Sequence, residues 1–123
     1  MGLFRRNKNT NKPVISQILD LVPRWIFDSC TKTYKTDKGC SKYKTYDQFV
    51  ALTFGQLYKC HTLSDISTGI GVSETFISDL GLKQSPARST MSDGNKNRDW
   101  HVFENLYFKL LSHYKSVLKK HHK

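Results

Sequence analysis

The stretch "LKQSPARSTMSDGNKNRDW", from Leu82 to Trp100, decides how the fold is interpreted. It contains Pro86, Gly94 and almost no large apolar side chain, yet it lies between two strongly apolar stretches. With Ser85 as the N-cap and Pro86 as the first helical residue, the sequence predicts a helix of about three turns over residues 85–96. We therefore interpret the stretch as a helix with an exposed working face.

The two faces of this expected helix differ in chemistry. Ala87, Met91 and Gly94 recur at spacings of four and three, so we expect these small or flexible residues to pack on the core. The other face carries side chains that donate hydrogen bonds or positive charge. These are Arg88, Ser89, Ser92, Asn95 and Lys96.

The preceding segment predicts two short helices joined by a tight turn. Thr62 is placed to cap the first helix, Gly71 and Ser73 interrupt the apolar spacing, and Gly81 stops the second helix. These two short helices and the helix over 85–96 together have the pattern of a helix-turn-helix unit. In such a unit the last helix enters the DNA major groove. The expected helices cover about 62–70, 73–80 and 85–96, with Gly81–Gln84 as a four-residue turn.

Two other interpretations stay open. Residues 73–80 also follow a Gly-centred turn and could be the reading helix, but Glu74 and Asp79 would then face phosphates with no cation nearby. In the third interpretation, 85–96 is a plain polar surface segment whose Arg88 and Lys96 are merely solvated.

The rest of the chain also shows helical periodicity, and no alternation of period two persists for more than a few residues. We expect Trp25, with Ile26 and Phe27, to point inward from the second helix, and Thr45 with Gln48 to form a capping box. Gly55 indicates the close approach of a neighbouring helix. The sequence predicts an all-α, compact bundle of six or seven helices, with helices over about 13–22, 23–34, 45–60 and 100–118 besides the three above.

Charge points to a polyanionic partner. The 123-residue chain has a formal net charge of +10, and its first twelve residues carry four cations and no acid. We expect residues 1–12 to form a basic arm, 13–118 a single helical domain and 119–123 a basic tail. Phosphate contacts are predicted for Arg5, Arg6 and Arg98, and Lys83 is predicted to contact DNA.

Other functional classes lack support. Cys30, Cys40 and Cys60 match no zinc spacing, and the sequence predicts no catalytic residue, metal or cofactor. No apolar run is long enough for a membrane span, and the N-terminus lacks the apolar stretch of a signal peptide. We expect a cytoplasmic, nucleoid-associated protein that has no membrane partner.

Several quoted stretches resemble one family. "QILDLVPRWIFDS", "TYDQFVALTFGQLYKCHTLSDIS", "LGL" and "RSTMSDGNKNRDWHVFENL" are similar to the N-terminal region of DDE transposases of bacterial insertion sequences, in the IS-four group. The resemblance runs from about Val14 to about Leu111. Gly94 departs from it, because the pattern has Ala there, and glycine loosens a helix.

The resemblance implies a non-catalytic module that recognises the terminal inverted repeats of a mobile element in double-stranded DNA. The three metal-binding carboxylates would lie on a separate RNase H-like domain, expected after about residue 120 and absent from this chain. That catalytic domain and a second copy of the chain are the expected protein partners. An alternative is a protein-interaction module for oligomerisation or regulation, in which the aromatic final helix pairs subunits without specific DNA contact.

Overall fold

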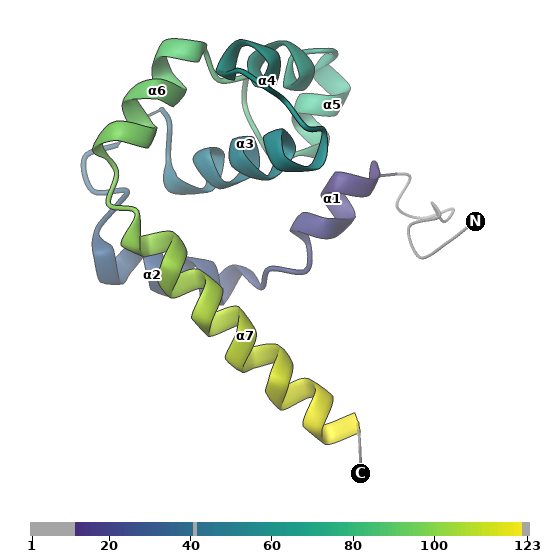
Figure 1. The fold of residues 1–123 in the computed structure, drawn as a ribbon, viewed down its shortest axis with the longest axis vertical. Coiled ribbons are helices and arrows are strands. Elements are labelled where there is room, and N and C mark those ends of the chain that lie inside the picture. The colour runs from purple at the N-terminus through teal and green to yellow at the C-terminus, as the bar shows by residue number, and fades with distance from the viewer. Residues whose placement is uncertain (1–11, 41, 122–123) are drawn as a thin grey trace.

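The structure is a computed structural model that describes residues 12–40 and 42–121. All regular secondary structure in this part of the chain is helical, which confirms the all-α prediction (Figure 1). The helices are α1 (Val14–Leu19), α2 (Arg24–Tyr34), α3 (Thr45–Leu57), α4 (Leu63–Ile70), α5 (Glu74–Asp79), α6 (Arg88–Asn97) and α7 (His101–His121).

Buried apolar residues form two clusters that meet at α3. One cluster lies among α1, α3, α4 and α6, and the other lies between α2 and α7. Tyr46 and Phe49 of α3 pack against both clusters, so the two are continuous. The first contains Ile15, Leu19, Val50, Ala51, Phe54, Ile66, Ile70, Leu80, Leu82 and Met91, and the second contains Ile26, Phe27, Cys30, Val102 and Leu106.

Helix α3 is the central helix, and α4 packs closely against it. A Cβ atom on Gly55 would lie 2.7 Å from Cδ1 of Ile66, which confirms that Gly55 permits the approach of a neighbouring helix. The predicted capping box is wrong. The Asp47 carboxylate instead accepts a hydrogen bond of 2.9 Å from the backbone N–H of Lys44, because the side chain of Gln48 is turned toward α6.

Helices α4 and α5 begin and end as the sequence predicts. The Thr62 hydroxyl accepts a bond from the N–H of Asp65, and Ser73 caps α5 in the same way. Only residues 71–73 separate the two helices. Gly81, at a φ of 80°, ends α5 in a Schellman motif, in which Leu82 N–H donates to the carbonyl of Ile77 and Gly81 N–H donates to that of Ser78.

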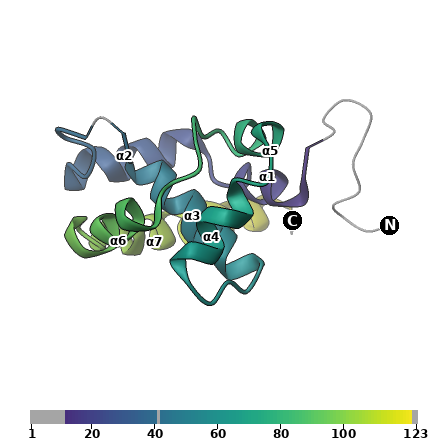
Figure 2. The same cartoon turned by 90° about the horizontal axis from the view of Figure 1, so that it is seen from above.

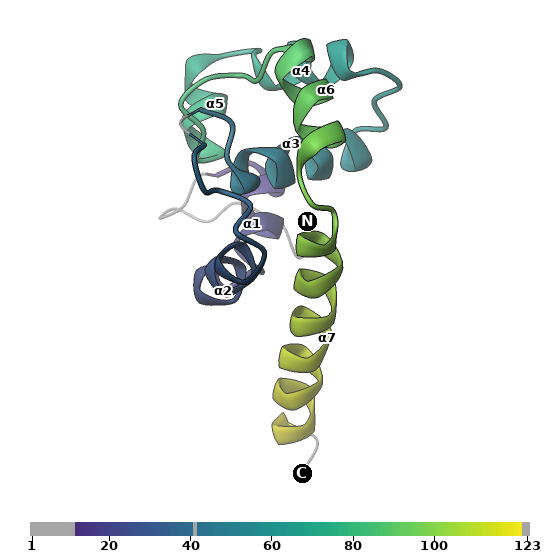
Figure 3. The same ribbon diagram turned by 90° about the vertical axis from the view of Figure 1, so that its left-hand side faces the viewer.

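Helix α7 runs beside α2 and continues beyond the other helices, as Figures 1 and 3 show. The Asp99 carboxylate accepts a bond of 3.0 Å from the N–H of His101 at its start, as predicted. The inward position of Trp25 is wrong, since that side chain is 67% exposed, and Trp100 is 61% exposed. Ile26, Phe27 and Cys30 fill the contact with α7, which leaves Trp25 beside it.

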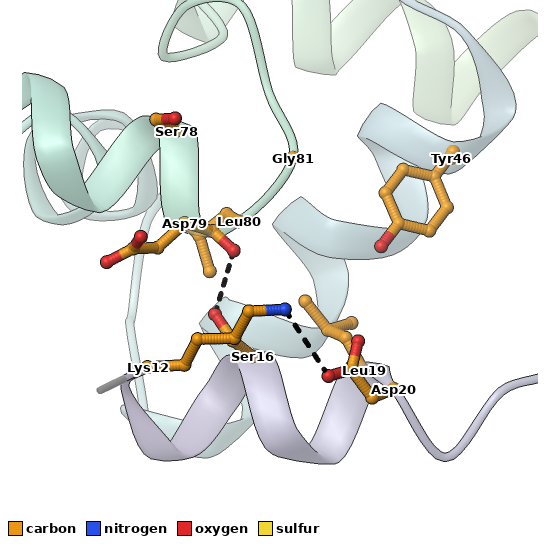
Figure 4. A pocket seen from close by; sticks show the side chains of 9 residues that line it. All are labelled: Lys12, Ser16, Leu19, Asp20, Tyr46, Ser78, Asp79, Leu80 and Gly81. Atoms are coloured by element: carbon orange, nitrogen blue, oxygen red, sulfur yellow. Dashed lines mark hydrogen bonds and ion pairs between the residues drawn. The ribbon is translucent and has the colours of Figure 1, made fainter. Parts of the chain in front are cut away.

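The last turn of α5 is tied to α1 (Figure 4). The Ser16 hydroxyl donates a bond of 2.9 Å to the carbonyl of Asp79, beside the ion pair of Lys12 and Asp20. Ser16 is 3% exposed, so this bond is part of the interior. No helix in the described part of the chain is long and apolar enough to cross a membrane.

Candidate nucleic-acid interface

The helix predicted over 85–96 exists, but it begins later, at Arg88. The N-cap is Ala87, with no side-chain capping bond, and the expected cap at Ser85 is wrong. The Ser85 hydroxyl instead donates a bond of 2.7 Å to the carbonyl of Ser67 at the end of α4, and Pro86 is buried. The expected four-residue turn is therefore an eight-residue connection, 80–87.

The inner face of α6 is set by Met91 and Gly94. Met91 is 1% exposed and belongs to the first core cluster. A Cβ atom on Gly94 would lie 2.6 Å from Cε2 of Tyr43, so glycine here lets the Tyr43 ring lie directly on the helix. Ala87, which was expected on this face, is exposed, because it precedes the first turn of the helix.

The outer side of α6 holds most of the predicted contact residues. Arg88, Ser89 and Lys96 are exposed, and Ser92 is half-buried. Lys83 is exposed in the connection that precedes the helix. Within the described residues, none of these five side chains makes a hydrogen bond or ion pair. Arg5 and Arg6 lie outside the described residues.

Asn95 and Arg98 are engaged internally. The Gln48 side chain, 4% exposed, donates a bond of 2.8 Å to Asn95 Oδ1 and accepts one of 2.9 Å from Arg98 Nη1. Arg98 Nη2 also donates to the carbonyl of Tyr43 and to Cys40 Sγ. This half-buried guanidinium joins α3, α6 and the α2–α3 connection, so we remove Arg98 from the expected phosphate contacts.

The Tyr43 ring completes the support of α6. The guanidinium carbon of Arg98 lies 5.6 Å from the ring centroid. Burial raises the pKa of Tyr43 to about 12, although the nearby positive charge of Arg98 acts in the opposite direction. The hydroxyl therefore stays neutral at physiological pH, and Tyr43 acts here as a packing group.

The α2–α3 connection, residues 35–44, is polar and rich in lysine. It lies at the same side of the molecule as α6 (Figures 1 and 2). A groove of about 440 Å³ separates the two and is lined by Lys38 and Tyr43 on one side and by Asp93 and Arg98 on the other. The charge of the segment was visible in the sequence, but its position beside α6 was not.

The rival helix, α5, lies on the other side of α4 from α6 (Figure 1). It has six residues, its first turn contains Glu74, and the Ser73 hydroxyl occupies one of its free N–H groups. The first turn of α6 has neither an acid nor a side-chain cap. The N-terminus of α6 is therefore the more favourable of the two for a negatively charged group.

A family model described as a domain of unknown function, DUF4372, matches residues 10–83, which is more than half of the chain. The chain belongs to this family. The DUF4372 match includes α1 to α5 and ends before α6, so α6 and α7 lie outside it. No curated protein and no solved structure gives a significant match.

Proposed function

We propose that this DUF4372 protein binds double-stranded DNA through α6. The observation that carries the proposal is the outer side of α6, where Arg88, Ser89 and Lys96 are exposed without partners among the described residues and the first turn has no side-chain cap. The net charge of +10 supports a polyanionic partner. A polar helix seated on an apolar core, with its cations free, is suited to a DNA groove.

The chemistry assigns different roles to the exposed groups. Arg88, in the first turn, is placed to reach base edges, and a bidentate contact of arginine with guanine discriminates by about 1–3 kcal/mol. Ser89 and the free N–H groups beside it suit a phosphate oxygen. Lys83 and Lys96 add charge attraction that does not depend on base sequence.

The biological role that we propose is the targeting of a transposase to the ends of its mobile element. The similarity of the quoted stretches to the N-terminal region of IS-four group transposases supports this role. The chain would position DNA for the catalytic domain of the transposase. No cleavage chemistry is assigned to its own acidic residues.

Fluorescence anisotropy with a labelled DNA duplex at two salt concentrations tests the proposal. Wild-type protein should bind at low salt and weaken steeply as salt rises. Arg88→Ala should weaken binding on at least one sequence by about 5-fold to 100-fold, in line with one lost bidentate contact. Absence of wild-type binding at low salt would contradict DNA binding itself.

A second candidate function, self-association, is favoured by α7. Tyr107, Leu111, Tyr114 and Leu118 are exposed at spacings of four, three and four, the pattern of a coiled-coil seam. The adjoining side of α7 is already packed on α2 through Val102 and Leu106, and the Tyr114 hydroxyl donates a hydrogen bond to the carbonyl of Leu21. We propose that the exposed seam of α7 binds the same seam of a second copy of this chain.

Sedimentation velocity tests this second function. The wild-type chain should form a dimer at micromolar concentration, and Leu111→Lys should return it to a monomer without loss of helical content. Lys120→Gln, an exposed position on the other side of α7 from the seam, is the control that should leave the dimer intact. A monomeric wild type at high concentration would contradict the assignment.

A further inference from the structure

The α2–α3 connection carries four lysines that form no ion pair within the described residues. Lys35, Lys38, Lys42 and Lys44 are all exposed. None of them forms an ion pair within the described residues, where the only lysine in such a pair is Lys12. We call these four exposed lysines of the connection the lysine rim.

The two acids near the lysine rim accept hydrogen bonds from the start of α3. Asp37 accepts bonds of 2.7 Å from both the backbone N–H and the hydroxyl of Thr45, and Asp47 accepts one from the N–H of Lys44. These bonds fix the carboxylates against the start of α3. Asp37 and Asp47 thus hold the start of α3, while the four lysines stay exposed.

The rim and α6 are joined rigidly by the Arg98 contacts. Arg98 follows the last residue of α6, and its guanidinium donates to Cys40 Sγ and to the carbonyl of Tyr43 in the connection. Tyr43 in turn lies on Gly94. A ligand that is seated on α6 therefore lies beside the connection that carries the four lysines.

We propose that the α2–α3 connection grips the phosphate backbone of the same duplex whose groove α6 enters. This inference rests on the proposed function of α6. The major groove is about 12 Å wide, and a helix with its side chains is about as broad, so elements beside a seated helix lie over a phosphate strand. The α2–α3 connection lies across the 440 Å³ groove from α6, and Lys38 lines that groove (Figures 1 and 2). The positive charge of its lysines matches the negative charge of the phosphate strand.

The contact is one of charge with charge, so it carries no base preference. Lysine binds phosphate as a point charge, and each neutralised phosphate adds about −0.9 to the slope of log affinity against log salt. The connection should thus strengthen binding to every duplex equally, while Arg88 decides which sequence is preferred.

The test compares two double variants of the full chain that lose the same charge. Lys38→Gln with Lys42→Gln removes two lysines of the rim, and Lys115→Gln with Lys119→Gln removes two from the exposed far part of α7. Anisotropy is measured over a salt series, on two duplexes of different sequence. The circular dichroism spectrum of each variant is recorded, so that unfolded protein is recognised.

The rim variant should lose about two from the salt slope and bind about tenfold more weakly to both duplexes at low salt. The α7 variant should change by less than twofold. Equal effects in the two variants, or an unchanged slope in the rim variant, would overturn this inference. If Arg88→Ala still weakens binding in that case, the proposed function stands, whereas a wild type that binds no duplex removes both proposals.

Discussion

Helices α5 and α6 are the two candidates for the DNA-reading helix, and they differ in what their N-termini offer. Helix α5 follows α4 after only residues 71–73, the spacing of a tight helix-turn-helix, but its first turn is capped by Ser73 and contains Glu74. Helix α6 follows an eight-residue connection, yet its first turn is uncapped and carries Arg88. The length of the preceding turn favours α5 as the DNA-reading helix, while the charge and the uncapped N–H groups of the first turn favour α6.

The difference shows that, within one fold, the helix with the shorter preceding turn need not be the helix whose charge suits DNA. A phosphate near α5 would meet the acids of residues 62–82, a segment that holds three acids and no Lys or Arg. Like charges that lose their water in an interface are costly, whereas turn length is an adaptable feature of the scaffold. We therefore give the charge pattern the greater weight.

Reversal of charge on α6 should have the largest effect. Arg88→Glu with Lys96→Glu replaces two free cations by acids on the outer side, and duplex binding at low salt should fall by roughly 100-fold or more. The comparison variant on α5 is Glu74→Gln with Asp79→Asn, which removes both of its acids and should alter affinity by less than about threefold. A large gain in affinity from the α5 variant, with little loss from the α6 variant, would reverse our assignment.

Two variants that each remove a hydrogen bond to one of these helices distinguish an effect on stability from an effect on DNA binding. Gln48→Ala removes the buried group that bonds Asn95 and Arg98, and it should lower the free energy of unfolding by about 2–3 kcal/mol. Ser16→Ala removes the bond to the end of α5, at a cost of about 1 kcal/mol. Denaturant titration measures both costs.

At a temperature where both variants are folded, only Gln48→Ala should weaken DNA binding, because it frees α6 from α3. Equal binding by the two variants would show that the orientation of α6 does not matter for the complex.

A smaller effect is expected from Asp93, an exposed acid on α6 that lines the groove opposite Lys38. Asp93→Asn removes one negative charge from the proposed surface, so duplex binding should strengthen by about twofold to fivefold at low salt. The control is Asp28→Asn on α2, an exposed acid paired with Arg24, which should have less effect. Weaker binding by Asp93→Asn would place this carboxylate in a direct contact with a base, contrary to our account.

The smallest effect concerns the packing of Tyr43 on α6. Its pKa is raised to about 12, while tyrosine in the unfolded chain ionises near 10, so the folded state loses stability as pH rises from about 10 to 12. An ultraviolet titration should show one phenol that ionises near 12, and Tyr43→Phe should abolish that step. Titration of every tyrosine near 10 would show that the ring is not packed as described.

The sequence predicted the helices well, because their signals are local. Thr62, Gly71 and Gly81 mark ends by capping or by backbone conformation, which depend on near neighbours. Ser85 was misassigned as a cap because its hydroxyl finds the carbonyl of Ser67, eighteen residues away. Helical periodicity also predicts Trp25 in the interior, but Ile26, Phe27 and Cys30 occupy the contact between α2 and α7, and Trp25 is exposed.

The candidate site was predicted in part, for the same reason. Exposed Arg88, Ser89 and Lys96 follow from the helical phase of α6, which Met91 sets. The internal use of Arg98 depends on Gln48 and Tyr43, about fifty residues earlier in the chain. No local pattern shows such a contact, and the lysine rim beside α6 was missed for that reason.

The most direct test of the central claim is the mapping of the duplex on the protein by NMR. The backbone amide signals of the labelled chain are followed while a short DNA duplex is added at low salt. We expect the largest shifts at residues 88–96 of α6, with further shifts in the α2–α3 connection and little change in α5. Largest shifts at residues 74–79, with α6 unmoved, would contradict it.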